Sequence, residues 1–169
     1  MTITHAAGTS STGDAELDAR LPFDEPYQIP EATAQSIRSV QATGGRLIAI
    51  GTTVVRALEH AASVHGTIRE TTGLATNKVG AAMELRVVDA IVSGTHETGT
   101  SHHQLLSAFV DRRTLAKMDE ILHQHCYRTH EFGDSVFVEK SRDRAAWMEP
   151  VVFVTGHRDA EVLTKAISV

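Results

Sequence analysis

The chain has 169 residues, of which 41% are hydrophobic and 22% are charged, a composition typical of a globular protein with one substantial core. Its formal net charge of −5 argues against a dedicated nucleic-acid binder, whose affinity would depend on a basic surface. The single cysteine excludes an intrachain disulfide, and no apolar run is long enough to cross a bilayer. Because the N-terminal residues also lack the basic and apolar blocks of a secretory signal, we expect a cytoplasmic protein.

The first third of the chain predicts a tail followed by helix, strand and helix. Residues 1–20 are small and polar without apolar periodicity, which is typical of a flexible tail. Pro30 opens a predicted helix that should end at the Gly44-Gly45 pair. The apolar strand Arg46–Ile50 then enters a second helix, from about residue 53 to 64, whose apolar positions share one face.

The middle of the chain alternates loops with further elements. Residues 67–82 combine glycine and threonine with few large apolar residues, so we expect a loop that can include short strands. Residues 84–92 show the β-branched alternation of a strand. Helical periodicity follows over 105–110 and 113–126, and residues 132–138 resemble a turn that leads into a strand.

The C-terminal segment repeats the order of strand, glycine turn and helix from Val151 onward. It is either a final structural strand and helix or a tail that pairs with a neighbour. The whole pattern predicts an α/β fold, with α+β as the alternative, in which a mixed sheet is flanked by helices in a single layered domain. We divide the chain into a flexible tail (1–20), an α/β domain (21–139) and an extension (140–169).

The turn after the first strand has two interpretations. Gly51, Thr52 and Thr53 join the strand to the helix, and the first N–H groups of a helix have no intrahelical partner. These groups, the helix dipole and the two hydroxyls could together hold a carboxylate or a phosphate. The same pattern without a ligand is an ordinary connection in which Thr52 or Thr53 caps the helix.

Charged residues one turn into this helix also leave two alternatives. Arg56 and Glu59 are three residues apart, a spacing at which an ion pair forms on a helix surface. Alternatively, Arg56 leans back toward the helix N-terminus and adds its guanidinium group to the anion site.

Histidines are frequent, and six of the ten lie between residues 96 and 130. His96 follows a predicted strand in a polar loop beside Glu97, and its imidazole could take or release a proton near neutral pH. It could equally be a histidine of a surface loop. The remaining histidines lack the paired spacing of a zinc site, so we predict no metal. We interpret Cys126 as buried packing, and Asp134 as either a turn residue or a carboxylate presented at a strand start.

Several sequence blocks occur in the order in which one enzyme family carries similar blocks. The blocks are Glu25 to Pro30, Gly45 to Glu59 with its Gly-Thr-Thr-x-x-Arg-x-Leu-Glu element, Ser93 to His96, Ser101 to Phe109, and Phe132 to Asp134. Together they resemble the C-terminal half of the S-adenosylmethionine:tRNA ribosyltransferase-isomerase family of queuosine biosynthesis.

This resemblance implies an activity and a set of site residues. Such enzymes transfer and isomerise the ribosyl part of S-adenosylmethionine onto a deazaguanine of a tRNA anticodon, releasing adenine and methionine. By resemblance, S-adenosylmethionine is the co-substrate, tRNA is the partner, and no metal is expected. Gly51, Thr52, Thr53 and Arg56 would bind the co-substrate, and His96 and Glu59 would be catalytic.

The resemblance covers residues 21–139, and it leaves two hypotheses. The family's N-terminal half, with its β-barrel domain, has no counterpart here, nor do residues 140–169 have one in the family. The loop around His96 lacks the family's Asn, Phe and Pro. One hypothesis is an enzyme that needs a separate N-terminal-half protein or forms a homo-oligomer. The alternative is a diverged, non-catalytic module that binds a small molecule or a protein.

Overall fold

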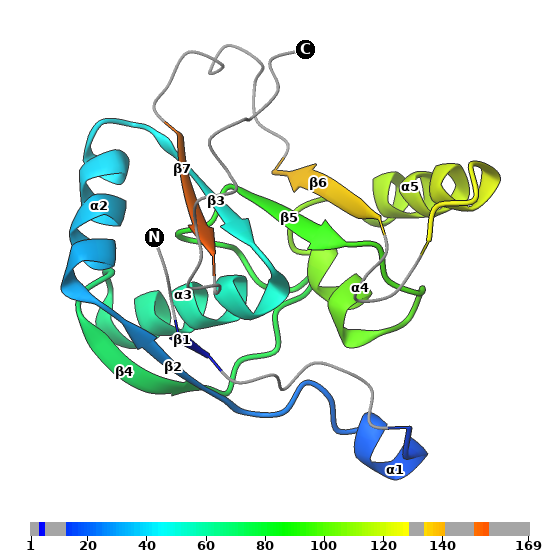
Figure 1. Cartoon of the computed structure of the whole chain (residues 1–169), viewed down its shortest axis with the longest axis horizontal. Helices are drawn as coiled ribbons and strands as arrows, with labels where there is room; N and C mark the ends of the chain where they lie inside the picture. Colours follow the sequence, from blue (N-terminus) through cyan, green and yellow to red (C-terminus); the bar gives the residue numbers. More distant parts are fainter. Residues whose placement is uncertain (1–3, 6–12, 129–133, 141–150, 156–169) are drawn as a thin grey trace.

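Two β-sheets enclose one helix in the computed structural model, which describes residues 4–5, 13–128, 134–140 and 151–155 (Figure 1). The antiparallel sheet has the order β1-β2-β4 and the mixed sheet the order β6-β5-β3-β7. Their strands are β1 (Thr4–His5), β2 (Glu25–Ile29), β3 (Arg46–Ile50), β4 (Thr71–Ala75), β5 (Ala90–Gly94), β6 (Ser135–Glu139) and β7 (Val151–Thr155). The helices are α1 (Ala15–Asp18), α2 (Glu31–Ala42), α3 (Thr52–His65), α4 (Ser101–Leu106) and α5 (Arg112–Gln124). The predicted α/β fold with flanking helices is confirmed, although two sheets are present where we expected one.

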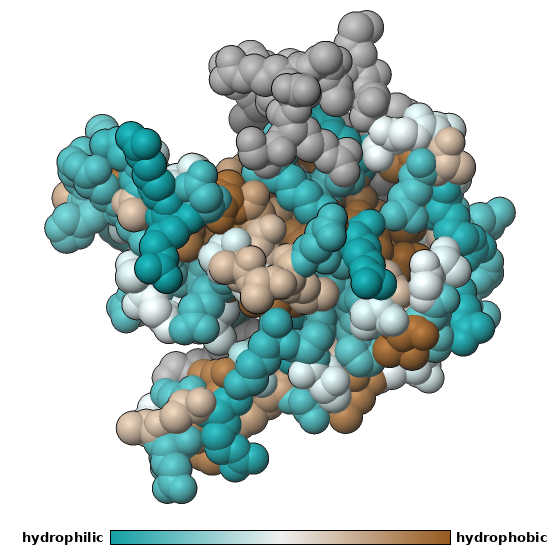
Figure 2. All heavy atoms as spheres, turned by 180° about the vertical axis from the view of Figure 1, so that it is seen from behind, coloured by the Kyte–Doolittle hydropathy of each residue, from teal (hydrophilic) through white to brown (hydrophobic). Residues whose placement is uncertain are grey.

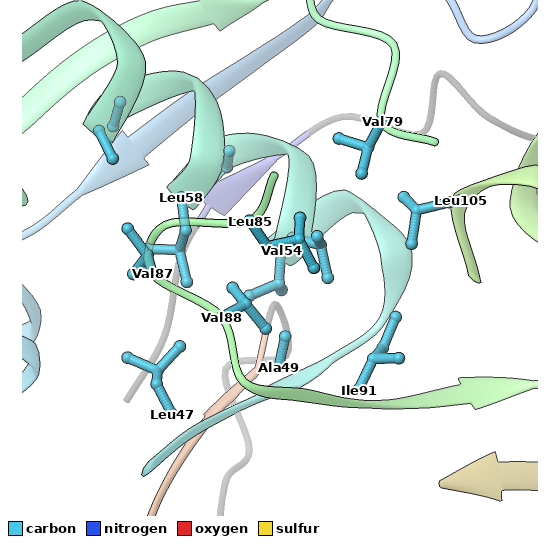
Figure 3. Packing of buried hydrophobic residues seen from close by; sticks show 14 of the residues in the cluster. Leu47, Ala49, Val54, Leu58, Val79, Leu85, Val87, Val88, Ile91 and Leu105 are labelled. Atoms are coloured by element: carbon cyan, nitrogen blue, oxygen red, sulfur yellow. The ribbon is translucent and has the colours of Figure 1, made fainter. Parts of the chain in front are cut away.

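Helix α3 is the centre of the core because it contacts strands of both sheets. Nine of its 14 residues are buried, which requires apolar or internally paired side chains around most of its circumference. Figure 3 shows Val54 and Leu58 of α3 turned toward Val87 and Val88 of the segment that crosses the helix. The helix ends at Gly66, whose φ of 75° is the left-handed conformation that glycine adopts most readily.

Strand β3 lies inside the mixed sheet, between β5 and β7. It runs parallel to β5 on one side and to β7 on the other, and four of its five residues are buried. Helices α2 and α3 both contact it, as is typical of parallel strands covered on both faces.

On the face shown in Figure 2, apolar surface is divided into separate patches between hydrophilic residues. None of the helices in the described part of the chain is long and apolar enough to cross a membrane.

The strand expected over residues 84–92 is shorter than predicted, since it begins only at Ala90. The preceding backbone bonds to a side chain instead of a neighbouring strand. The buried carboxylate of Glu59 accepts the N–H groups of Arg86, Val87 and Val88 at 2.8 to 2.9 Å. This contact holds the segment across α3, and so the apolar alternation there serves helix packing rather than a ladder.

Two short elements lie within the segment that we expected to be a flexible tail. Residues Thr4–His5 pair with β2, and Asp14 caps α1, because its carboxylate accepts two N–H groups of the first turn. Within the expected loop over 67–82, residues 71–75 form strand β4. The strand predicted from Val151 is β7, whereas the helix expected after it lies outside the described residues.

We expect Glu59→Gln to lower the free energy of unfolding by about 1.5–3 kcal/mol, because an amide NH₂ would replace one oxygen that accepts a buried N–H. Urea unfolding measures this change. The matched control is Glu84→Gln at an exposed position, which should change stability by less than about 0.5 kcal/mol. Equal stability of the two variants would contradict the role that we assign to Glu59.

A pH effect follows from the pair of Tyr27 on β2 and His60 on α3, whose hydroxyl and Nδ1 lie 3.1 Å apart. Burial lowers the pKa of His60, and the nearby His65 and Arg56 lower it further. Below the unfolded value of about 6.5, the unfolded chain binds a proton that the folded chain does not, so stability falls as the pH decreases through this window.

Denaturant unfolding between about pH 7.5 and 5.5, above the range in which carboxylates titrate, measures this slope. His60→Gln should reduce the decrease in stability, whereas His123→Gln at an exposed position should leave it unchanged. A slope that is the same in wild type and His60→Gln would show that this imidazole is not responsible.

Candidate functional site

A cavity of about 910 Å³ lies beside the carboxyl ends of the adjacent parallel strands β3 and β5. Four parts of the chain form its walls: the N-terminal turns of α3, the loop after β5 with the start of α4, residues 18–22, and residues 78–79. In α/β proteins, ligands bind at this edge because the loops that leave parallel strands converge there. The cavity is therefore the candidate functional site.

The turn at the end of β3 positions the first helical residues. Gly51 has a φ of 95°, which favours glycine, and its N–H donates to the carbonyl of Val92 on β5 at 2.9 Å. Helix α3 begins directly afterwards, with no side-chain cap at Gly51. Thr52 is buried and lines the cavity, whereas Thr53 is half-buried and is not part of the described lining. Gly51 thus shapes the turn, and Thr52 presents the helix N-terminus to the cavity.

Arg56 borders the cavity, but its guanidinium group is bound within the protein. Its side chain is 1% exposed and donates to the carboxylate of Glu25 on β2 at 2.5 Å. The same group donates to the carbonyls of Phe23, Ala75 and Asn77 at 2.9, 3.0 and 3.2 Å. Burial lowers the pKa of Arg56, and the charge of Glu25 opposes this effect. Arg56 therefore links α3 to the antiparallel sheet, and it does not form the surface ion pair with Glu59 that its spacing allowed.

Glu59 lies one turn further along α3 and is fully buried. Its carboxylate accepts the three backbone N–H groups described above, and it is not among the residues that line the cavity. A catalytic group must touch the reacting atoms. The geometry instead gives Glu59 the role of holding the crossing segment of residues 86–88 in place.

His96 lies in the loop after β5 and faces the cavity together with His102 of α4. The centroids of the two imidazole rings are 4.2 Å apart, with an angle of 38° between the planes. The backbone just before His96 is anchored because Thr95 donates its N–H to the Asp134 carbonyl at 2.8 Å and its hydroxyl to the Arg128 carbonyl. Asp134 also accepts the Arg128 N–H at 2.8 Å, so it is a turn residue that supports this loop.

The other end of the loop is held by α5. Asp119 accepts the Thr98 hydroxyl at 3.2 Å and lies 2.9 to 3.0 Å from Nε2 of the buried His103 on α4. Thr98 lines the main cavity and also a second cavity of about 580 Å³ between α4 and α5. Sequence reasoning missed Asp119, because its partners lie 16 and 21 residues away and no local spacing connects them.

The cavity also gathers charges that the sequence did not bring together. Lys78 contributes an ammonium group, while Asp18 and Glu97 contribute carboxylates from segments that are far apart in the sequence. Within the described ranges, no group of three or more His, Cys, Asp or Glu side chains is placed to hold a metal ion. Cys126, which we interpreted as buried packing, is exposed and has a φ of 55°, because it belongs to the turn that ends α5.

Comparison with known proteins gives consistent matches. A family model described as "Queuosine biosynthesis protein" matches residues 1–138. An S-adenosylmethionine:tRNA ribosyltransferase-isomerase of Thiobacillus denitrificans is 34% identical over 127 residues, which cover 75% of this chain and 37% of that protein. The enzyme of the same name from Geobacter sulfurreducens is 36% identical over 114 residues, which cover 68% of this chain and 33% of its own.

A solved structure supports the same relation. The crystal structure of an S-adenosylmethionine tRNA ribosyltransferase from Thermotoga maritima matches with a TM-score of 0.63 and 29% identity. The match covers 67% of this chain and 40% of that one. This chain therefore spans about a third to two fifths of the length of the proteins that it resembles.

Asp119 of α5 contacts both Thr98 and His103, and we call this contact the brace of the His96 loop. The brace can be tested with Asp119→Asn. The amide keeps the size of the side chain but cannot accept the Thr98 hydroxyl and the His103 ring together, so stability should fall by about 1–2 kcal/mol. The imidazole resonances of His96 and His102 should shift, and amide exchange over residues 95–100 should accelerate. Glu120→Gln, which affects an exposed i,i+3 pair on the same helix, is the control and should leave stability, resonances and amide exchange unchanged. Unshifted resonances in Asp119→Asn would contradict the brace.

Proposed function

The chain belongs to the queuosine biosynthesis protein family, and we propose that it forms part of the S-adenosylmethionine site of a tRNA ribosyltransferase-isomerase. The cavity at the N-terminus of α3 is the observation that carries this proposal. Its volume of about 910 Å³ is sufficient for a ligand of this size.

The chemistry of the cavity wall complements the charges of S-adenosylmethionine. The methionine part carries a carboxylate, an ammonium and a sulfonium group. The N-terminal turn of α3 at Thr52, with Lys78 nearby, suits the carboxylate. Asp18 and Glu97 suit the two cationic groups, and the apolar side chains of Leu21 and Leu105 suit the adenine ring.

His96 is the group that we propose for proton transfer. Its imidazole lines the same cavity as the helix N-terminus, and its loop is anchored on both sides by Thr95 and Thr98. Release of adenine from the ribosyl group requires a proton at the nitrogen that leaves, and an imidazole can supply it. Glu59 and Arg56 support this wall from within the core.

The remaining parts of the site would come from elsewhere. Because the chain spans only 33% to 37% of the lengths of the two enzymes compared above, we propose that a separate polypeptide or a second copy completes the site. The tRNA would contact that composite surface, since the net charge of −5 gives this chain no general affinity for phosphate. We place this activity in the cytoplasm, where tRNA is modified.

A non-catalytic binding module is the second candidate function. The observation that favours it is that Arg56 and Glu59 each bind partners inside the protein, Glu25 and the backbone N–H of Val87 among them, so that folding alone accounts for these two residues of the helix motif. Such a module would keep the scaffold and the cavity without turnover.

Isothermal titration calorimetry of the full chain with S-adenosylmethionine tests the proposal. We expect saturable heat, and Thr52→Val should weaken affinity about threefold to tenfold through loss of one hydroxyl at nearly constant volume. Thr53→Val, just outside the described lining, is the matched control and should bind like wild type. Titrations with methionine and with adenosine separate the two halves of the ligand.

Absence of heat from the purified chain, both alone and with a protein that carries the missing family half, would remove the enzyme proposal. Equal weakening in the two threonine variants would contradict the location of the site. Release of adenine, followed by chromatography after addition of unmodified tRNA, distinguishes the two functions. Binding without adenine release, in the presence of the completing protein, would favour the non-catalytic module.

A further inference from the structure

The edge of the mixed sheet is filled by a segment that lies beyond the family match. Strand β7 pairs with β3 along its whole length, from Arg46 opposite Val151 to Ile50 opposite Thr155, in parallel orientation. The family match ends at residue 138, so β7 lies outside the matched part of the chain. A strand from outside the matched residues therefore pairs with the edge of the mixed sheet.

The backbone of β3 requires a neighbour on this side. The N–H and C=O groups of Leu47 face the β5 side, since they contact the Asp89 side chain at 3.0 Å and the Asp89 N–H at 2.9 Å. Because backbone groups alternate along a strand, those of Ile48 and Ile50 face β7. These residues lie in a strand that is largely buried, where unpaired backbone groups would be costly.

The sequence of β7 is typical of a strand. Its residues read Val-Val-Phe-Val-Thr, and β-branched and aromatic side chains favour strands. The edge of β3 is thus a surface that recognises an extended, β-branched segment in parallel register.

We propose that the β3 edge is a strand-accepting surface and that residues 151–155 of the same molecule are its occupant. The occupant is this chain's own segment, bound within one molecule. Any other extended polypeptide that docks on this edge has to displace β7. This inference is independent of S-adenosylmethionine binding.

Two proline variants of the full chain give a matched test. In the register of β7 on β3, the N–H of Val154 donates to the carbonyl of Ile48, whereas the N–H of Phe153 points away from β3. Val154→Pro removes a hydrogen bond of the ladder. Phe153→Pro removes an N–H on the outer side of an edge strand, where proline is tolerated.

Amide hydrogen exchange by NMR, combined with light scattering, provides the readout. In the wild type we expect a monomer with protected Ile48 and Ile50 amides. Val154→Pro should lose at least about tenfold protection at Ile48 and Ile50 while Ala49, which faces β5, stays protected. Phe153→Pro should resemble wild type, and a peptide with the sequence of residues 149–157 should restore protection only in Val154→Pro.

Three results would overturn the proposal. The first is free exchange of Ile48 and Ile50 in the wild-type chain, and the second is unchanged protection in Val154→Pro. The third is a wild-type dimer with protected amides that lose protection on dilution to the monomer, because the strand would then come from a second copy. If Val154→Pro also loses protection at Ala49, the substitution has opened the whole sheet. The wild-type monomer is then the test: protected Ile48 and Ile50 amides support the proposal, and freely exchanging amides overturn it.

Discussion

The buried ion pair between Arg56 and Glu25 is the interaction on which the rest of this structure depends. A helix enclosed between two sheets cannot expose a charged side chain to water, so a guanidinium group at its centre must find its partners inside the protein. One carboxylate and three backbone carbonyls satisfy it, and the same contacts tie β2 and β4 to α3. Removal of one partner from such a pair leaves an uncompensated buried charge, and this strongly destabilises the folded protein.

Glu59 performs a second positioning task one turn further along the helix. Its three accepted N–H groups fix the segment that leads into β5, and β5 leads into the loop with His96. The two buried charges of α3 therefore hold different neighbours of the helix, Arg56 the antiparallel sheet and Glu59 the crossing segment. These contacts fix the position of the helix whose N-terminal turn lines the cavity, which is the preorganisation that a site for a charged ligand needs.

The chain matches only about a third of the length of its relatives, and so the cavity is considered on the groups that this chain itself supplies. The cavity brings together a helix N-terminus, an ammonium group, two carboxylates and two adjacent imidazoles, which are the groups that the proposed S-adenosylmethionine site uses. The same chain closes its own sheet with a strand from outside the matched residues. The strand that pairs with the β3 edge and the residues that line the cavity therefore come from different segments of the chain.

The sequence by itself determined the local elements and the family. Apolar periodicity gave β3 and α3, the Gly-Thr-Thr turn located the junction between them, and ordered motif blocks identified the relatives, because these signals depend on residues close together along the chain. The tertiary structure alone decided the partners of the charged side chains. Arg56 pairs with a residue 31 positions away and Glu59 with N–H groups 27 to 29 positions away, and their helical spacing of three predicted a contact with each other instead. Pairing of buried charges depends on which segments the fold brings together, and no spacing along the chain records that.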